Sequence, residues 1–450
     1  MRPSAWLPLA VLSACTVCGA ATRPHYGGTL RVEMRATPAT LDPATPDAAP
    51  LASLVFEPLV RLDASGAPQP CLAISWQHDA AGKRWQFNLR PGVKFHDGFG
   101  MVPAAVVASL QAALTGVTIA AAGDAITIRA DHPEPFLLLE LAHNGLVFAH
   151  DADGGLVGTG PFRVTSWEPG RRATLAANTD YWGGRAFVDA LEVQMGRGLR
   201  EQLVDLEIGK TDIAEIAPNA SRRATDRGRA LWQSAPVNLI ALVFAPGRAA
   251  DPRLREALAL SIDRAAMHSV LLQKQGEITA ALLPQWLSGY AFAFPAAPNL
   301  ARARALTAEL PASARTLALS YDPAIPGGRA IGERVAVNAR DAGLTVQVSP
   351  QNPQADLGLV EVRVPSLDAA RALVNIAPSI SLEVFQPVGF TPEALYESER
   401  RLLEDFRAIP LFQLPDLYGA ASRVRVFQPP PVTRMGDWRF ENIWLSGTAP

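Results

Sequence analysis

The sequence is poor in lysine and in long apolar runs. Its 450 residues include 41 Lys and Arg against 43 Asp and Glu, and only four of the basic residues are Lys. A net charge of −2 leaves no basic excess to hold a phosphate backbone, so nucleic acid is not an expected partner. Beyond residue 22 no stretch reaches 18 apolar residues without a charge, and we expect no membrane-spanning helix there.

Cysteine is also scarce, with two residues near the amino terminus, Cys15 and Cys18, and one more at Cys71. Cleavage beyond Cys18 would leave Cys71 alone, without a partner for an intrachain disulfide, whereas cleavage at Cys15 would still allow a Cys18–Cys71 bond. A single Cys71 between two apolar neighbours is expected to act as a small buried hydrophobic residue.

The signatures of catalysis and metal binding are missing as well. The chain holds no HExxH, no GxSxG and no Walker A pattern, and its seven His are scattered. The turn Gly158–Gly160 is followed by Pro161, which removes an N–H that a phosphate would need. His96 and Asp97 are neighbours, and neighbours on a strand point to opposite faces. We therefore expect a protein that is not an enzyme and that uses no metal or cofactor.

The amino terminus has the form of an export signal. Arg2 is the only charge in the first 22 residues, and the apolar run 5–14 is too short to span a bilayer. The letters LSAC, ending at Cys15, resemble a bacterial lipobox, in which the cysteine is acylated and becomes the first mature residue. Ordinary cleavage after small residues is the alternative. The signal is therefore expected to cover residues 1–14 or 1–21; a buried amino-terminal helix is the competing interpretation.

The hydrophobic pattern beyond the signal indicates an α/β chain of two interleaved lobes. Strict alternation over Trp85–Arg90 predicts a half-buried strand, and the strongly apolar Asn238–Phe244 suits the middle of a sheet. Thr316–Tyr321, Arg329–Ala342 and Leu344–Val348 predict a strand–helix–strand unit of the kind that builds parallel sheet. Further helices are expected over Glu201–Ile208 and Pro392–Arg407.

Several short motifs occur together and in a fixed order. They are Gly27–Val32 with Leu41–Pro43; Val55–Asp63, Pro70–Trp76 and Phe87–Gly98; Gly158–Phe162, Trp167–Gly170 and Asn178–Gly184; Gly209–Ala214; Asp251–Arg264; and Ile409–Phe412. As an ordered set they resemble the family 5 extracellular solute-binding proteins, which are receptors of ABC importers for oligopeptides, dipeptides, nickel chelates and related solutes. Most of the motifs are turns and strand ends, so they are chiefly signatures of a fold.

The resemblance implies a two-lobed periplasmic-binding-protein-like fold of the class II type, with the ligand buried between the lobes when they close. The first lobe would comprise residues 26–248 plus 411–450, with an inserted subdomain near 54–157, and the second lobe residues 249–410. The implied protein is a monomeric receptor outside the cytoplasmic membrane. It would capture a peptide or another small solute and deliver it to the permease subunits of an ABC importer.

The resemblance also suggests where the ligand would lie. Arg35 and Thr37, on the loop after the first strand, would form the cleft floor, and Phe244 and Trp286 would face them. The stretch 354–399 has no counterpart of the family's Trp-rich, Asp-containing segment, which anchors the peptide amine in peptide receptors. By position alone, the candidates for that anchor are Asp356 and Asp368.

Two departures from the family leave the function open. The inserted subdomain and the second lobe are both short, and no clear acidic anchor is present, so we expect a small or weakly charged solute, or weak peptide binding. Trimmed lobes also favour an alternative, a degenerate solute-binding-fold protein that acts in sensing or in protein–protein interaction. A secreted hydrolase is a third interpretation, but it lacks a nucleophile–base pair.

Overall fold

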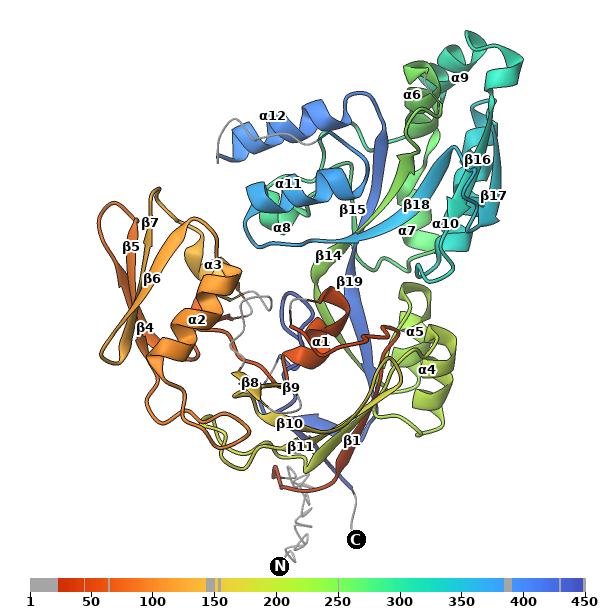
Figure 1. Ribbon diagram of the computed structural model, residues 1–450. Helices are drawn as coiled ribbons and strands as arrows, with labels where there is room; N and C mark the ends of the chain where they lie inside the picture. The colour runs from red at the N-terminus through yellow and green to blue at the C-terminus, as the bar shows by residue number, and fades with distance from the viewer. Residues whose placement is uncertain are drawn as a thin grey trace, which may run out of the picture.

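One long mixed sheet runs through the molecule (Figure 1). The computed structural model describes residues 23–43, 45–63, 65–142, 150–152, 155–249, 251–383, 391–428 and 430–447. The strands of the sheet, in spatial order, are β10 (Phe162–Glu168), β11 (Arg172–Ala177), β12 (Ala190–Gln194), β1 (Thr29–Glu33), β13 (Ile213–Glu215), β19 (Ala408–Ala420), β14 (Ala230–Phe244), β18 (Leu357–Arg363), β16 (Thr316–Tyr321) and β17 (Thr345–Pro350), while β15 (Glu277–Ile278) also pairs with β19.

Two long antiparallel strands, β14 and β19, connect the two halves of this sheet. Their pairing is irregular near Pro236, which lies opposite Pro415. Proline has no N–H to donate to the ladder, so the sheet is weakest at this crossing. β13 pairs with the end of β19 beyond the crossing, and β18 pairs with the end of β14 on the other side. The crossing is therefore the hinge between two lobes, as Figure 1 shows.

The first lobe is built on the half of the sheet that contains β1. β1 lies parallel to β12 and β13, and a core that includes Leu30, Val32 and Phe162 covers the sheet. The buried Asp212 ties the amino-terminal strand to the carboxyl-terminal segment, because it accepts hydrogen bonds from both Arg31 and Arg423. The helices of this lobe are α1 (Ala49–Ala52), α4 (Leu199–Glu207) and α5 (Ser221–Asp226).

A separate antiparallel sheet forms the inserted subdomain at the left of Figure 1. The predicted alternation is confirmed here, because Trp85, Phe87 and Leu89 are all buried in the core of this subdomain. Cys71 is buried in the same core, and burial raises the pKa of its thiol to about 12. The sheet order is β4 (Ala73–His78), β5 (Arg84–Leu89), β7 (Ala125–Ala130) and β6 (Val117–Ala122), with helices α2 (Pro103–Ala113) and α3 (Leu137–Leu141) and the small pairs β2 (Val60–Leu62) with β3 (Pro68–Pro70) and β8 (His150–Ala152) with β9 (Gly155–Val157).

The fully buried carboxylate of Glu57 joins the subdomain to the first lobe. Four side chains donate to it through N–H or O–H groups: Arg61 at 2.5 Å, Trp182 at 2.8 Å, and Tyr181 and Thr159 at 2.9 Å each. The thiol of Cys71 is a weaker fifth donor at 3.7 Å. A buried carboxylate without partners would be strongly destabilising, so the folded protein needs all of these donors around Glu57. With Cys71 included, they come from four of the sequence motifs, which explains why the motifs occur as a set.

The second lobe has a core on each face of its half of the sheet. The predicted strand–helix–strand unit is present, with β16 and β17 parallel and joined by a helix. The predicted helix 392–407 is shorter than expected. It ends at Leu403, and Phe406 has a φ of 52°, which a helix cannot continue through.

The helices of the second lobe cover both faces of its sheet. One face is covered by α6 (Pro252–Ser261), α7 (Arg264–Val270), α9 (Leu300–Ala308) and α10 (Gly328–Asp341), and the other by α8 (Gln285–Ser288), α11 (Ala369–Ser379) and α12 (Pro392–Leu403). Among all the helices described, none is both long enough and apolar enough to span a bilayer.

Glu399 on α12 is a buried acid whose ionisation makes the stability of the second lobe depend on pH. Its carboxyl accepts hydrogen bonds from Leu282 N and Leu283 N and, at 2.5 Å, from the Tyr290 hydroxyl. Burial raises the pKa of Glu399 to about 7, although these hydrogen bonds act in the opposite direction.

We expect the protein to lose stability as the pH rises from 5.0 to 7.5. The folded protein keeps a proton on Glu399 until the pH approaches about 7, whereas the unfolded chain releases it at its lower pKa, so this contribution to stability is lost as the pH rises through the range. Glu33, whose pKa burial also raises to about 7, acts in the same direction. Glu399→Gln should reduce the difference in unfolding temperature between these two pH values by about 2–5 °C. Thermal unfolding followed by circular dichroism measures it, with the exposed Glu333→Gln as control; an unchanged pH slope in Glu399→Gln would contradict this assignment.

Candidate functional site between the lobes

The two lobes meet at the carboxyl ends of their parallel strands. Arg35 follows β1, Gly198 lies beyond β12 and Ala217 follows β13, while the loop 322–327 of the second lobe follows β16. In open α/β sheets, ligands bind outside the carboxyl ends of the strands, because loops and helix starts converge there. Two pockets occupy this position, and both are lined by Arg35, Leu199 and Pro326.

The outer pocket, which we call the outer chamber, measures about 500 Å³, within the range of small-molecule sites. Its first-lobe wall is formed by Arg35, by the start of α4 and by residues near α5. Its second-lobe wall is the loop 323–327. The walls are largely apolar, and the charged side chains that line it are Arg35, Arg200 and Arg223.

The inner pocket lies at the hinge and measures only about 50 Å³. The guanidinium of Arg35 donates to Glu215 at 3.0 Å, and Asn238 donates to Asp416 at 2.8 Å. Glu361, on β18 of the second lobe, lines the same pocket. Burial raises the pKa of both Glu215 and Glu361, and the nearby Arg35 partly offsets that rise. The pocket therefore holds charged groups from both lobes at the point where the lobes rotate.

Several polar contacts cross from one lobe to the other. Arg35 donates to the carbonyl of Ala324 at 2.7 Å. Arg371 at the start of α11 pairs with Glu140 and, at 3.5 Å, with Glu134 of the inserted subdomain. These contacts hold the two lobes together on both sides of the hinge, so the described arrangement is a closed one.

A third crossing is centred on Gln273, and the nearby Gln275 adds one hydrogen bond to the Ser221 hydroxyl at 3.3 Å. The Gln273 amide donates to the carbonyl of Asn219, and its oxygen accepts from Arg222 N at 3.2 Å and from the Ser221 hydroxyl at 3.3 Å. Gln273 and the following Lys274 have φ values of 51° and 63°, a region that costs a residue with a side chain on the order of 1 kcal/mol. The cross-lobe hydrogen bonds offset that cost only when the lobes are together.

We expect Gln273→Ala to open the protein. Each lost hydrogen bond contributes about 0.5–1.5 kcal/mol, so the open form should gain at least about fivefold in population relative to the closed form. Small-angle X-ray scattering would show an increased radius of gyration, with unchanged circular dichroism. Gln77→Ala is the control, because the Gln77 amide donates to Gln86 within one sheet. Identical scattering from the wild type and Gln273→Ala would contradict this role.

The structure separates the four residues predicted to line the cleft. Arg35 lines both pockets. Thr37 is exposed and lies against Gly170 and Gly196 instead. Phe244 is only 5% exposed and packs in a core of the second lobe.

Trp286 lies beside the hinge. Its indole N–H donates to the carbonyl of Pro236 at 2.8 Å, and the guanidinium of Arg434 lies 4.4 Å from its ring centre. Trp286 therefore contacts the first lobe, but it is not among the residues that line the two pockets.

Both candidate amine anchors already serve the fold. Asp356 accepts from Ala318 N at 2.8 Å and thereby joins β16 to the start of β18. Asp368 is 4% exposed and caps α11 by accepting from Ala370 N at 2.9 Å. Neither residue lines either pocket. The predicted lipidation site, Cys15, lies outside the described residues.

Sequence reasoning overlooked Glu361, Asp416 and Arg200. Glu361 interrupts the apolar run of β18, and Asp416 follows Pro415 within a buried strand. A charged residue in a strand of this kind is a signal that was available in the sequence. Arg200 gives no such signal, because a charged residue in the first turn of a helix is usually solvent-exposed.

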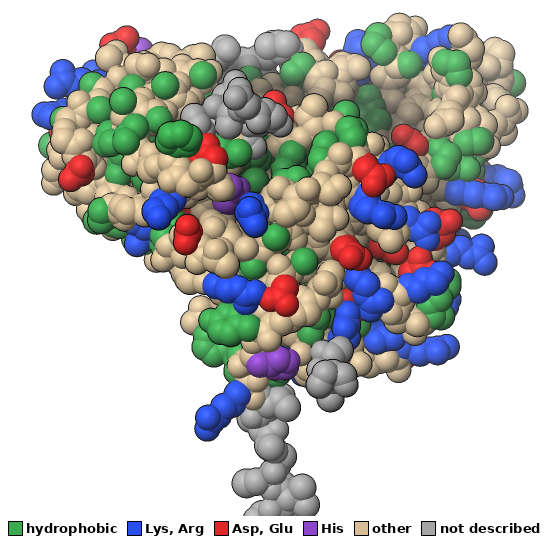
Figure 2. Space-filling model, turned by 60° about the horizontal axis from the view of Figure 1, so that its bottom comes forward, with side chains coloured by type: hydrophobic (Ala, Val, Ile, Leu, Met, Phe, Trp, Pro, Cys, Tyr) green, Lys and Arg blue, Asp and Glu red, His purple; other side chains and the backbone are tan. Residues whose placement is uncertain are grey.

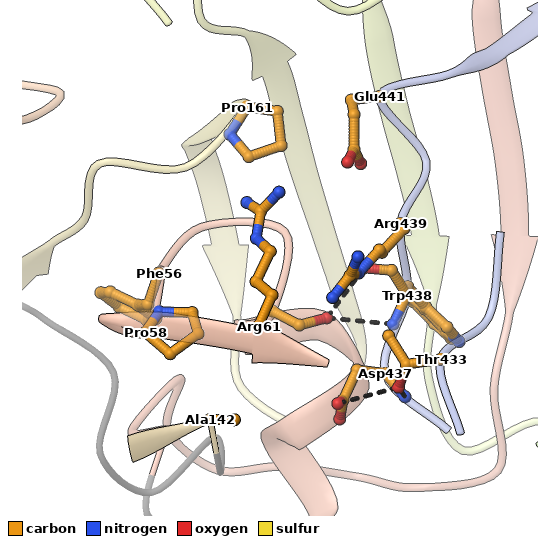
Figure 3. A pocket seen from close by; sticks show the side chains of 11 residues that line it. Phe56, Pro58, Arg61, Ala142, Pro161, Thr433, Asp437, Trp438, Arg439 and Glu441 are labelled. Atoms are coloured by element: carbon orange, nitrogen blue, oxygen red, sulfur yellow. Dashed lines mark hydrogen bonds between the residues drawn. The ribbon is translucent and has the colours of Figure 1, made fainter. Parts of the chain in front are cut away.

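A third pocket, shown in Figure 3, has a structural role. It measures about 40 Å³, and Arg61, Arg439 and Glu441 extend toward it from the subdomain junction and the carboxyl-terminal segment. Ser53 donates to the carbonyl of Trp438 at 3.0 Å and accepts from Trp438 N at the same distance. A space of this size holds water molecules and not a solute.

Charges of both signs alternate over the lower face of the molecule, as Figure 2 shows at its right-hand side. Examples near α4 are Arg223 with Glu207 at 2.6 Å and Arg197 with Asp205 at 2.7 Å. No group of three or more His, Cys, Asp or Glu that could hold a metal ion occurs in the part of the chain that the structure describes.

Comparison with known proteins places this architecture in a family. The model of bacterial extracellular solute-binding proteins, family 5 Middle, matches residues 67–366. The chain belongs to this family of solute-binding proteins, and its fold is the family's two-lobed α/β fold, as the sequence predicted.

The chain is similar to several relatives of known sequence. It is 27% identical over 249 residues to the probable D,D-dipeptide-binding periplasmic protein DdpA of Escherichia coli (strain K12), a match that covers 49% of this chain and 48% of that protein. It is 26% identical over 352 residues to di/tripeptide-binding protein 2 of Pseudomonas aeruginosa (strain UCBPP-PA14), covering 64% of each. The matches thus span about half to two thirds of the length of these relatives. Among solved structures, an ABC transporter substrate-binding protein from Sinorhizobium meliloti matches with a TM-score of 0.67 and 25% identity, over 93% of this chain and 100% of that one.

Proposed function

We propose that this protein is the extracytoplasmic solute-binding receptor of an ABC importer. It captures a peptide or another small solute between its lobes by reversible closure and passes it to the permease subunits. The observation that carries the proposal is the outer chamber of about 500 Å³, which lies at the carboxyl ends of the strands of both lobes and next to a hinge of two strands. Membership of the solute-binding family and the similarity to dipeptide- and tripeptide-binding relatives support it.

The same proposal includes the division and location of the chain. The first lobe is residues 26–248 plus 411–450 with a subdomain near 54–157, and the second is 249–410. The protein works as a monomer outside the cytoplasmic membrane, after removal of residues 1–21 or of residues 1–14 with acylation of Cys15. Intact-mass analysis of membrane and soluble fractions tests the export step. A mature chain that keeps Met1 would contradict export, and a diacyl mass on Cys15 that Cys15→Ala abolishes would decide for the lipid anchor.

The receptor function is tested by ligand-induced stabilisation. A solute that binds only the folded protein raises its unfolding temperature, because binding adds RT ln(1 + [L]/Kd) to its stability. Di- to pentapeptides, sugars and metal chelates form the panel, at concentrations up to 1 mM. At least one class should raise the unfolding temperature, and the radius of gyration should not increase with it. A panel in which no solute has an effect would contradict the receptor function and favour a role in sensing or protein–protein interaction.

A further inference from the structure

The outer chamber has a strongly one-sided charge. Three of its lining side chains are arginines, Arg35, Arg200 and Arg223, and none is an acid. The remaining walls are mainly leucine, isoleucine, alanine and proline side chains. An oxyanion placed beside these guanidinium groups would be attracted to them, and salt would weaken that attraction because Arg200 is exposed to solvent.

Two of these three arginines already have carboxylate partners. Arg223 forms two hydrogen bonds with Glu207, at 2.7 Å and 2.6 Å. Arg35 donates to Glu215 at 3.0 Å and also reaches the carbonyl of Ala324. These pairs neutralise two of the three positive charges, so only one of the three guanidinium groups has no carboxylate partner.

Arg200 is that residue. It belongs to the first turn of α4 and is exposed to solvent. No ion pair or hydrogen bond joins its guanidinium to another side chain within the described ranges. The nearest acid along the helix, Glu201, turns the other way, because it accepts from Gly198 N and pairs with Arg197 at 3.6 Å. The chamber therefore keeps one uncompensated cation with a planar set of donors.

We propose that the outer chamber binds the oxyanion of the solute, a carboxylate or a phosphate, through Arg200. A guanidinium presents paired N–H donors that match the two oxygens of such a group. The chamber is large enough for an apolar or neutral body attached to the anion, and the walls suit such a body. The preferred ligands are therefore small solutes that carry one oxyanion at one end. This inference rests on the proposed receptor function and names the class of its ligand.

Isothermal titration calorimetry with four probes tests the assignment. Trialanine carries a free carboxylate, and trialanine amide is the same peptide without it. Inorganic phosphate tests the other oxyanion, and maltotriose is a neutral solute. At least one of the two probes that carry an oxyanion, phosphate and the zwitterion trialanine, should bind; they are called the anionic probes below with reference to that group alone. If trialanine binds, the amide should bind at least about tenfold more weakly, because it lacks the charge that the guanidinium recognises.

Two variants locate the contact. Arg200→Gln should weaken binding of the anionic probe about fivefold or more and should reduce its dependence on salt, with little effect on folding because the side chain is exposed. Arg400→Gln on α12 is the control, a partly exposed arginine outside the chamber whose partners, Glu397 and Glu404, lie on α12 and at its end, and it should leave binding unchanged.

The results that would overturn the inference are distinct from those that would overturn the receptor function. Two results would reject the oxyanion site and leave a receptor for another class of solute. The first is tight binding of trialanine amide or maltotriose while neither anionic probe binds. The second is binding of an anionic probe by Arg200→Gln as tight as that by the wild type. Absence of binding by both anionic probes would likewise reject it. Only a wider panel without any stabilising solute would reject the receptor itself.

Discussion

Glu57→Ala is expected to lower the free energy of unfolding by about 3–5 kcal/mol. The substitution leaves the guanidinium of Arg61 buried without its carboxylate and deprives Tyr181, Trp182 and Thr159 of their acceptor. Each unsatisfied buried donor adds a cost of its own. Urea denaturation followed by circular dichroism and tryptophan fluorescence measures the change.

Two further substitutions separate the buried contacts from a general effect of removing charge. Glu57→Gln keeps one acceptor oxygen and should cost less than Glu57→Ala. Glu168→Ala removes a partly exposed carboxylate that lies 3.7 Å from Arg171, and it should change stability by no more than about 0.5 kcal/mol. A loss below about 1 kcal/mol in Glu57→Ala would show that the junction does not depend on this carboxylate.

Gly158→Ala is expected to be about as damaging, at roughly 3 kcal/mol or more, for a steric reason. A Cβ atom at this position would lie 2.0 Å from the carbonyl oxygen of Val55 and 2.8 Å from the ring of Phe56. The neighbouring Gly160 donates its N–H to the same Val55 carbonyl at 2.9 Å, so the two segments cannot separate without losing that bond. The unfolding midpoint in urea should fall accordingly, with an m-value close to that of the wild type.

Gly92→Ala is the matched control, because it tests conformation without crowding. Gly92 has a φ of 73°, and no atom lies within 4 Å of a Cβ added there. Its cost should be limited to the left-handed backbone, about 1–2 kcal/mol. Equal losses in Gly158→Ala and Gly92→Ala would mean that close packing against Val55 is not the reason for the glycine.

These two expectations explain why the family motifs carry so much of the sequence. Glu57, Thr159 and Trp182 belong to three motifs that are far apart in the chain, yet they share one buried carboxylate. His96, from a further motif, places its imidazole 3.0 Å from the carbonyl of Gly160. The motifs identify the fold because they describe a single packed junction, and for the same reason they say little about the ligand.

The residues that line the cleft, in contrast, do not belong to a common set of motifs. Its charged groups, Arg35, Arg200, Glu215 and Glu361, come from segments that share no motif and that meet only because of the order of the strands. Arg35 contacts Glu215 and Ala324, which are 180 and 289 residues away along the chain. A local sequence pattern cannot predict contacts between residues this far apart in the chain.

The sequence alone determined the local elements and the class of fold. Alternation placed Trp85, Phe87 and Leu89 in a core, and the spacing of apolar residues predicted the strand–helix–strand unit that became β16, α10 and β17. These predictions hold because burial of one face depends only on residues close together in the chain.

The tertiary structure alone decided how far the hinge strands extend and what the cleft contains. The apolar pattern predicted Asn238–Phe244, but β14 begins at Ala230, because its more polar first half is held by pairing with the far end of β19. The pairing of β14 with both β18 and β19 places Phe244 in a core and Asn238 in the pocket at the hinge. A residue's partner across a sheet is set by strand order and register, and those depend on the whole chain.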